Sequence, residues 1–319
     1  MHFGKVVTRL PRLFNKPIWV CSILCLLATG PSPTFAAAIQ VVTTTSDLKS
    51  LTEAVGGAHV AVTSLATPGT NAETFQPHPQ DLQKLQAAAM VVRVGLDYDL
   101  WLDGLLKRTG RTELMRHGKA HVDASYGIAL LEIRSASLDA NSGHGHGGGN
   151  PHYWLDPGNA EIISANILDG LRRIDPDNAP TYAANRERFV GLLRAKQQTW
   201  KARLAAFAGT PVLAYHDSWA YFARSFRLHI VDLIEPKPGI PPSPARLAGL
   251  IKKMQDERVL AIIKQPFDPD AMPGLLAQKT GAKIVVLASS VGSLPQTGDY
   301  FSMMDFNVAT LAAAYAPGP

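Results

Sequence analysis

A short segment of this chain combines histidines with aromatic residues. The stretch HGHGGGNPHYWLDP, residues 144–157, contains His144, His146 and His152. A further histidine, His216, follows the apolar run VLAY and precedes DSW. Imidazole nitrogen is a common ligand for zinc and other divalent first-row metals. The residue types therefore favour a metal site, although a histidine beside Tyr and Trp also fits a hydrogen-bonded packing residue.

The four histidines differ in their predicted surroundings. His152 stands between a loop and a helix predicted to begin near Asn159. His216 stands at the carboxyl end of a predicted strand, where open α/β sheets place their ligand sites. His144 and His146 lie in a Gly- and Ser-rich stretch without apolar periodicity, which predicts a mobile surface loop. Together His152 and His216 could bind a cation, whereas each of them alone also fits a hydrogen-bonded packing residue.

The first 38 residues read as a secretory signal peptide. They hold a basic start, an apolar core at residues 18–29 and the small-residue cleavage sequence TFAAA. An apolar run of about a dozen residues is shorter than the ~20 residues that span a bilayer. Both cysteines, Cys21 and Cys25, lie in this segment, and the residues before Cys25 do not suit lipid modification. The mature chain is therefore expected to be soluble and periplasmic, with only nitrogen and oxygen ligands for a metal.

Charge argues against a nucleic-acid partner. The formal net charge of the whole chain is +5, and residues 1–38 contribute four basic residues and no acidic ones, so a charge of +1 remains after cleavage. A nearly neutral chain offers no basic footprint for nucleic acid. Residues 39–319 are numerous enough to form two lobes with cores.

Beyond residue 38 the pattern alternates β-branched runs with helical segments. The first set begins IQVVTTT, SDLKSLTEAVGG and HVAVTSL, and a second set starts after residue 210. This alternation predicts α/β layers with parallel sheets. Between the sets, residues 180–207 keep apolar residues at helical spacing, which predicts a helix roughly 40 Å long. We predict an N-terminal α/β lobe at 39–175, a linking helix at 176–208 and a C-terminal α/β lobe at 209–319.

The order of the longer motifs resembles that of the zinc- and manganese-binding solute-binding proteins of bacterial ABC transporters, the zinc-uptake or TroA-like family. The motifs are VVTTTSDLKSLTEAVGG, ETFQPHPQDLQKLQAAAMVVRVGLDYDLWLDGLL, NPHYWLDPGNA, VLAYHDSWAYFARSFRL, IEPKPGIPPSPARLAGLI, TGAKIVVL and DYFSMMDFNVATL. They cover nearly the whole mature chain. The resemblance implies two α/β lobes joined by one long backbone helix, with a divalent metal captured in the cleft between them for delivery to a membrane permease.

The resemblance also implies a set of ligands. His152 matches the histidine of the family's PHxWLDP-like motif, and His216 matches the His or Glu that precedes an acidic residue and an aromatic helix. The first family ligand is normally a histidine in Asp-Pro-His, whereas NAETFQPHP places Glu73 at that position. A glutamate oxygen also binds zinc or manganese. His78, five residues further on, is expected either to compensate as a ligand or to be a surface residue at a helix start.

The fourth ligand stays open at this point. The family usually has an Asp or Glu in the C-terminal lobe, whereas the candidate positions here carry Gln265, Ser289 and Ser290. A water molecule or a loop histidine is a further alternative. For His144 and His146 the resemblance implies a loop that collects metal, and the alternative is a solvated linker in which these histidines have no role. Two neutral histidines and one carboxylate give a site of charge −1, and such a nitrogen-rich set suits Zn²⁺ better than Mn²⁺.

The sequence thus predicts a monomeric periplasmic binding protein, and not an enzyme. Its expected partners are a divalent metal ion, Zn²⁺ in preference to Mn²⁺, and the membrane permease of an ABC transporter. The alternative is a divergent family member with weakened or lost metal binding that binds another ligand or a protein partner, as the changes at Glu73 and Gln265 allow. A zinc hydrolase with Glu73 or Asp217 as general base has less support, because no HExxH motif, nucleophile elbow or phosphate-binding glycine loop occurs.

Overall fold

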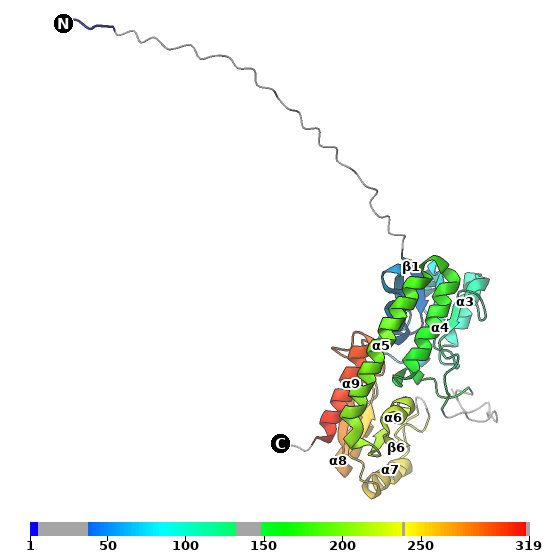
Figure 1. Ribbon diagram of the computed structural model, residues 1–319. Coiled ribbons are helices and arrows are strands. Elements are labelled where there is room, and N and C mark those ends of the chain that lie inside the picture. The colour runs from blue at the N-terminus through cyan, green and yellow to red at the C-terminus, as the bar shows by residue number, and fades with distance from the viewer. Residues whose placement is uncertain (6–37, 132–147, 238–239, 317–319) are drawn as a thin grey trace. The chain divides into compact units, whose positions relative to one another are not determined.

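The computed structural model describes residues 1–5, 38–131, 148–237 and 240–316 (Figure 1). The chain divides into two units, Met1–Ala36 and Ala37–Pro319. In the first unit only residues 1–5 are described, and they form no helix or strand. Most of the predicted signal peptide, and His144 and His146 of the predicted loop, lie outside the described residues.

The second unit begins with a four-stranded parallel sheet in the order β2-β1-β3-β4. Its strands are β1 (Ile39–Thr43), β2 (Val60–Ser64), β3 (Met90–Arg93) and β4 (His121–Asp123). The helices between them are α1 (Ser46–Gly56), α2 (Pro79–Ala87) and α3 (Trp101–Thr109). All four residues of β3 are buried, as expected for a strand that is covered on both faces of a parallel sheet.

A second four-stranded parallel sheet follows in the order β6-β5-β7-β8. Its strands are β5 (Pro211–Ala214), β6 (His229–Leu233), β7 (Ala261–Lys264) and β8 (Lys283–Val286). The helices of this lobe are α6 (Ala220–Phe226), α7 (Pro244–Asp256) and α8 (Ala271–Thr280). The predicted fold class, two α/β lobes with parallel sheets, is confirmed.

Three longer helices connect and flank the lobes: α4 (Asn159–Ile174), α5 (Ala179–Leu204) and α9 (Tyr300–Tyr315). Short 3₁₀ turns occur at Gly57–His59, Ala72–Thr74, Thr112–Leu114, Tyr153–Leu155, Pro176–Asn178 and Ala205–Phe207. With 26 residues, α5 is roughly 40 Å long. It packs on α1 and α4 of the first lobe and on α9 beside the second (Figure 1). The long backbone helix therefore belongs to both lobes.

Successive buried side chains along a strand point alternately to the two faces of its sheet. Val92 and Ile263 point into one large cluster that runs through both lobes and includes Trp200 of α5. Their neighbours Val91 and Ile262 point to the opposite sheet faces, into two smaller clusters that each belong to one lobe. The lobes therefore share a core along α5, which limits their independent motion.

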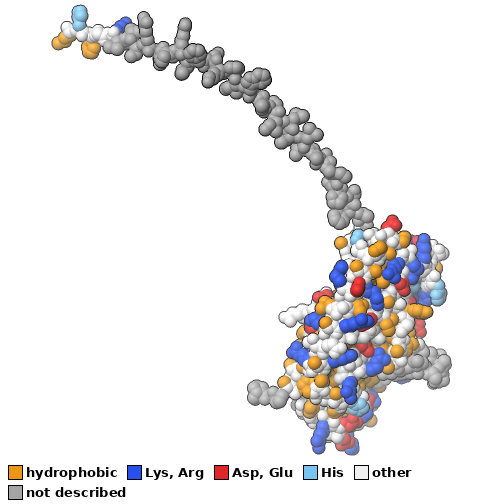
Figure 2. Space-filling view, in the orientation of Figure 1, with side chains coloured by type: hydrophobic (Ala, Val, Ile, Leu, Met, Phe, Trp, Pro, Cys, Tyr) orange, Lys and Arg blue, Asp and Glu red, His pale blue; other side chains and the backbone are white. Residues whose placement is uncertain are grey.

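The outer surface of α5 carries basic residues that pair with neighbouring helices. Arg194 lies 2.8 Å from Glu161 of α4, and Lys196 lies 2.6 Å from Asp305 of α9. Figure 2 shows basic and acidic side chains interspersed over this face, with apolar side chains scattered among them. Such exposed pairs contribute little stability, so the packing of α5 must come mainly from its buried side. None of the helices in the described part of the chain is both long and apolar enough to span a membrane.

Truncation of Trp200 tests the role of this shared core. Trp200 is 1% exposed, and its Nε1 donates to Asp305 Oδ1 at 2.8 Å. We expect Trp200→Ala to lower the free energy of unfolding by about 3–5 kcal/mol, because it leaves a cavity between α5 and α9. Urea unfolding measures this change, with Leu192→Ala at an exposed position of the same helix as the control. A loss no larger than that of the control would contradict the packing described here.

Candidate metal centre

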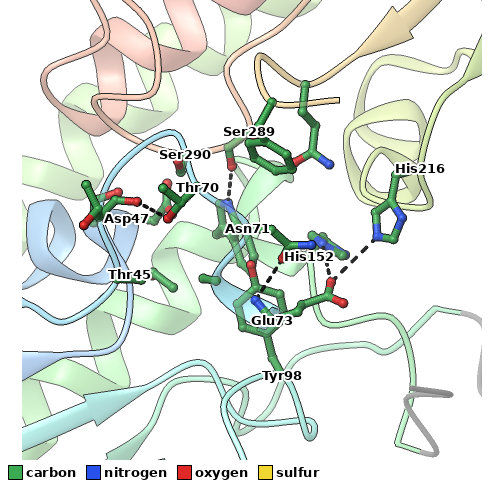
Figure 3. A pocket seen from close by; sticks show the side chains of 17 residues that line it. Thr45, Asp47, Thr70, Asn71, Glu73, Tyr98, His152, His216, Ser289 and Ser290 are labelled. Atoms are coloured by element: carbon green, nitrogen blue, oxygen red, sulfur yellow. Dashed lines mark hydrogen bonds and ion pairs between the residues drawn. The ribbon is translucent and has the colours of Figure 1, made fainter. Parts of the chain in front are cut away.

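Glu73, His152 and His216 converge from distant parts of the chain. Nε2 of His152 lies 3.2 Å from Oε1 of Glu73, and Nε2 of His216 lies 3.7 Å from the same oxygen. One potential ligand atom of each residue lies within 4.8 Å of the others. Figure 3 shows the carboxylate between the two imidazoles. Ligands about 2.0–2.1 Å from a tetrahedral zinc ion are roughly 3.4 Å apart, so these separations fit a shared ion.

Each of the three residues is held by its local backbone. Glu73 lies in the 3₁₀ turn after β2, where the side chain of Asn71 accepts the Glu73 N–H at 2.9 Å. His152 directly precedes another 3₁₀ turn, and its N–H donates to Asn150 Oδ1 at 3.0 Å. His216 follows β5 by two residues. Two turns and the end of a strand therefore position these three residues, which do not share one helix face.

The pocket around this group lies between the lobes, where the strand order of both sheets reverses. In each sheet the first strand in the sequence pairs with the second and the third, and the loops after these central strands meet at the pocket. Open α/β sheets bind ligands at such switch points. The pocket is a cavity of about 20 Å³, room for about one water-sized group. A single ion therefore fits its size.

Aromatic rings enclose one side of His152. The ring of Tyr98 stands edge-on to it at 5.6 Å between centroids, and the ring of Trp154 lies at 5.4 Å. Nε1 of Trp154 donates to the carbonyl oxygen of Ser289 at 3.0 Å, which links the first lobe to the second. These contacts exclude water from this side of the imidazole and fix its orientation.

A buried ion pair organises the loop after β3. Arg93 is fully buried, and its Nε donates to Asp99 Oδ1 at 2.9 Å. The Asp99 carboxylate also accepts the N–H groups of Val94 at 2.7 Å and Gly95 at 3.2 Å. Because a buried carboxylate needs such partners, the loop has one strongly preferred arrangement.

This arrangement supports a strained stretch that precedes Tyr98. Gly95, Leu96 and Asp97 have φ angles of 79°, 50° and 61°. The left-handed region costs a residue other than glycine roughly 1–2 kcal/mol. The hydrogen bonds of Asp99 offset this cost and bring Tyr98 against His152. The loop therefore stores strain next to the candidate site.

Glu235 adjoins His216, although the sequence analysis did not identify it. Its Oε2 lies 2.7 Å from Nδ1 of His216. An ionised carboxylate can only accept, so Nδ1 carries the proton and Nε2 faces Glu73. Carboxylates orient metal-binding histidines in this way. The available signal was the place of Glu235 just after the apolar strand β6, at the sheet edge where His216 follows β5.

His216 holds a proton in the metal-free protein. Burial alone would lower its pKa, but hydrogen bonds to Glu235 and Glu73 outweigh burial and raise the pKa from the ordinary 6.5 to about 10. At neutral pH the imidazolium therefore pairs with both carboxylates. A metal ion that binds Nε2 must displace this proton.

His78, which was a candidate ligand, lies outside the group formed by Glu73, His152 and His216. It is exposed and lies directly before α2, where its main-chain N–H donates to Asp81 Oδ2 at 2.8 Å. The structure does not bring it into the group of Glu73, His152 and His216. The physical reason is that the chain turns into α2 at this point, as in the alternative prediction of a surface residue at a helix start.

The candidates for a fourth ligand all line the pocket. Gln265 and Ser289 are buried, and Ser290 lies beside them. The main-chain N–H of Gln265 donates to Asp268 Oδ2 at 2.7 Å, which fixes the turn after β7. All three side chains are neutral, so none supplies the acidic ligand that the resemblance implies for this lobe.

Two parallel α/β lobes on one long helix, with nitrogen and oxygen donors buried in the cleft between them, define a two-lobed solute-binding protein. The comparison with known families agrees: the model of the ZnuA family, described as "Zinc-uptake complex component A periplasmic", matches residues 41–314. The chain belongs to this family, and the predicted family is confirmed.

Individual relatives are distant but cover most of the chain. A putative metal-binding protein of Treponema pallidum (strain Nichols) is 24% identical over 288 residues, which cover 89% of this chain and 89% of the relative. The iron-binding protein YfeA of Yersinia pestis is 24% identical over 302 residues, covering 92% and 91%. A crystal structure of ZnuA superimposes with a TM-score of 0.75 at 24% identity, covering 88% of this chain and 100% of that one. The relatives are binding proteins, so the prediction that the chain is not an enzyme is confirmed.

Replacement of Glu235 tests its contact with His216. Glu235→Gln keeps the size of the side chain but removes the charge that holds the Nδ1 proton. We expect about 10–100-fold weaker zinc binding, the usual effect of losing a partner that orients a ligand. Calorimetry measures the affinity, and Glu257→Gln, which alters the exposed His229–Glu257 pair, is the control. Zinc affinity equal to that of the wild type would show that Glu235 does not orient His216.

Proton competition predicts a pH dependence of metal binding. His216 is protonated below a pKa of about 10, so the apparent zinc affinity should rise with pH between 6 and 9, by up to about tenfold per unit. Folding stability of the metal-free protein should change in the opposite sense: the contribution of His216 is complete below pH 6.5 and is lost as the pH rises through about 10. Calorimetry in buffers of different ionisation enthalpy counts the released protons. Binding without proton release would contradict this charge state.

Proposed function

We propose that the protein is a periplasmic solute-binding protein that captures a divalent metal ion, zinc in preference to manganese, and delivers it to the permease of an ABC transporter. The observation that carries this proposal is the burial of one carboxylate between two imidazoles. The exposed fractions of the Glu73, His152 and His216 side chains are 4%, 6% and 10%. Buried charges are stable only when they are paired or bind a metal. A divalent ion can take the place of the His216 proton at this position.

The donor set supports zinc. Two imidazole nitrogens and one carboxylate oxygen are typical of zinc sites with three protein ligands, where water or another group takes the fourth position. Manganese favours sites richer in oxygen ligands. The neutral Gln265 and Ser289, where the resemblance implies an acidic group, add no charge that would favour manganese. The family description as a zinc-uptake component supports the same ion.

The position of the donors in the chain supports capture and delivery. Glu73 and His152 precede the long helix α5, and His216 follows it. A bound ion therefore connects the two lobes and fixes their relative position. A membrane partner can recognise the metal-loaded protein by that position. The family's periplasmic description and the predicted signal peptide at residues 1–38 support a location outside the cytoplasm.

The alternative of a relative that has lost metal binding has less support. The change from histidine to Glu73 leaves three donor atoms within 4.8 Å of one another. Burying two histidines and a carboxylate costs folding free energy unless these groups are paired. A protein that no longer bound metal would not be expected to retain all three in one buried cluster.

Removal of single donors tests the proposal. We expect His152→Ala and Glu73→Gln each to weaken zinc binding by at least about 100-fold, because each removes one of three protein ligands. Calorimetry on untagged, metal-stripped protein measures the affinity. His229→Ala is the matched control, since this side chain is 63% exposed and lies outside the site. Wild-type zinc affinity in both donor variants would refute the assignment.

The choice of ion is tested by thermal stability. A ligand that binds only the folded state stabilises it by RT ln(1 + [L]/Kd), so at the same free concentration the ion that binds more tightly raises the melting temperature more. Zinc should therefore raise the melting temperature of the wild type more than manganese does at the same free concentration. An equal or larger shift with manganese would show that oxygen ligands dominate the site.

A further inference from the structure

A cavity much larger than a metal ion opens beside the proposed site. Its volume is about 450 Å³, against about 20 Å³ for the ion pocket. Glu73, His216, Gln265, Asn71 and Phe267 line both spaces. An ion held by Glu73 and His216 would therefore form part of the wall of the larger cavity. Cavities of roughly 300–1,000 Å³ are the usual size for small organic ligands.

The walls of this cavity combine flat apolar groups with carboxylates. Tyr215, which directly precedes His216, and Phe267 supply aromatic rings. Glu73, Glu235 and Asp268 supply carboxyl groups, and the described lining residues include no lysine or arginine. When a divalent ion replaces the His216 proton, the three carboxylates outweigh its two positive charges by one, so the cavity keeps a net negative charge. It favours neutral or cationic molecules and disfavours anionic chelators.

The proposed metal site also leaves the fourth coordination position of the ion to a ligand from outside the protein. Zinc with three protein ligands takes its fourth ligand from outside the protein or from water. Glu73, His152 and His216 supply three donors, and the C-terminal lobe contributes the neutral Gln265 and Ser289 to the pocket. A bare ion needs no space beyond the small pocket. The larger cavity is explained when the fourth donor belongs to a molecule that occupies it.

We propose that the cavity binds a small neutral or cationic nitrogen ligand, which completes the coordination of the metal, so that the protein takes up the ion together with this molecule. The inference rests on the proposed function, because this ligand binds through the ion. Its donor nitrogen faces the metal, and its flat part packs against Phe267 and Tyr215. A cationic group on it pairs with Asp268, a residue that is 7% exposed and whose carboxylate accepts the Gln265 N–H at 2.7 Å.

Histamine is a suitable probe, because it carries an imidazole and an ammonium group. The experiment titrates histamine into the full chain loaded with one equivalent of zinc, and in parallel into zinc-free protein. Calorimetry should show one saturable site in the loaded protein and none in the zinc-free protein. Native mass spectrometry should show the ternary complex. Citrate, which is anionic, should form no such complex.

Two pairs of measurements locate the probe. Asp268→Asn keeps an acceptor for the Gln265 N–H but removes the charge, so histamine binding should weaken about tenfold while binding of imidazole, which has no ammonium group, is unchanged.

Pro241 lines only the larger cavity. Pro241→Trp should fill it and abolish binding of both probes, whereas Pro241→Ala should retain both. The zinc affinity of each variant is measured separately.

The outcomes separate this inference from the function on which it rests. If zinc binds but histamine does not bind to the loaded protein, the inference is overturned and the proposed function stands. Histamine that binds equally without zinc, or equally to Pro241→Trp, also overturns it. If zinc itself fails to bind, the proposed function fails and the inference fails with it.

Discussion

The burial of the Glu73 carboxylate against two imidazoles is the constraint to which the rest of the cleft responds. A carboxylate that is 4% exposed cannot stay charged without a cation beside it. In the metal-free protein that cation is the imidazolium of His216, which Glu235 holds from its other side. A divalent ion can replace the proton without moving the carboxylate. The same charge balance therefore stabilises the empty cleft and prepares it for a metal.

In this fold, loops from both sheets come together at the pocket that contains Glu73 and the two histidines. Parallel strands place their carboxyl ends at the same edge, and the loops after the central strands of both sheets reach the pocket. The buried pair of Arg93 and Asp99 fixes the loop that carries Tyr98, and Trp154 bonds across the cleft to Ser289. The core that both lobes share along α5 then holds the two lobes in a fixed relative position. Rigid turns on a common core are what allow distant residues to meet within a few ångströms.

The sequence predicted the fold well because strand and helix periodicities are local signals. The positions of His152 and His216 beside a turn and a strand end were also predictable. Glu73 was predicted only through the family resemblance, since no local pattern marks a glutamate in a loop as a candidate ligand. His78 was expected either as a compensating ligand or as a surface residue at a helix start, and the start of α2 leaves it exposed. Glu235 was missed because its contact with His216 depends on how β5 and β6 align, which periodicity does not encode.

The most direct test of the account is a crystal structure of the zinc-loaded protein with anomalous diffraction recorded at the zinc absorption edge. The account predicts one strong peak in the cleft, about 2.0–2.2 Å from a carboxylate oxygen of Glu73 and from Nε2 of both His152 and His216. Glu235 should remain bonded to Nδ1 of His216. An anomalous peak bound to other residues, with Glu73 still paired to the two histidines and no ion between them, would contradict it.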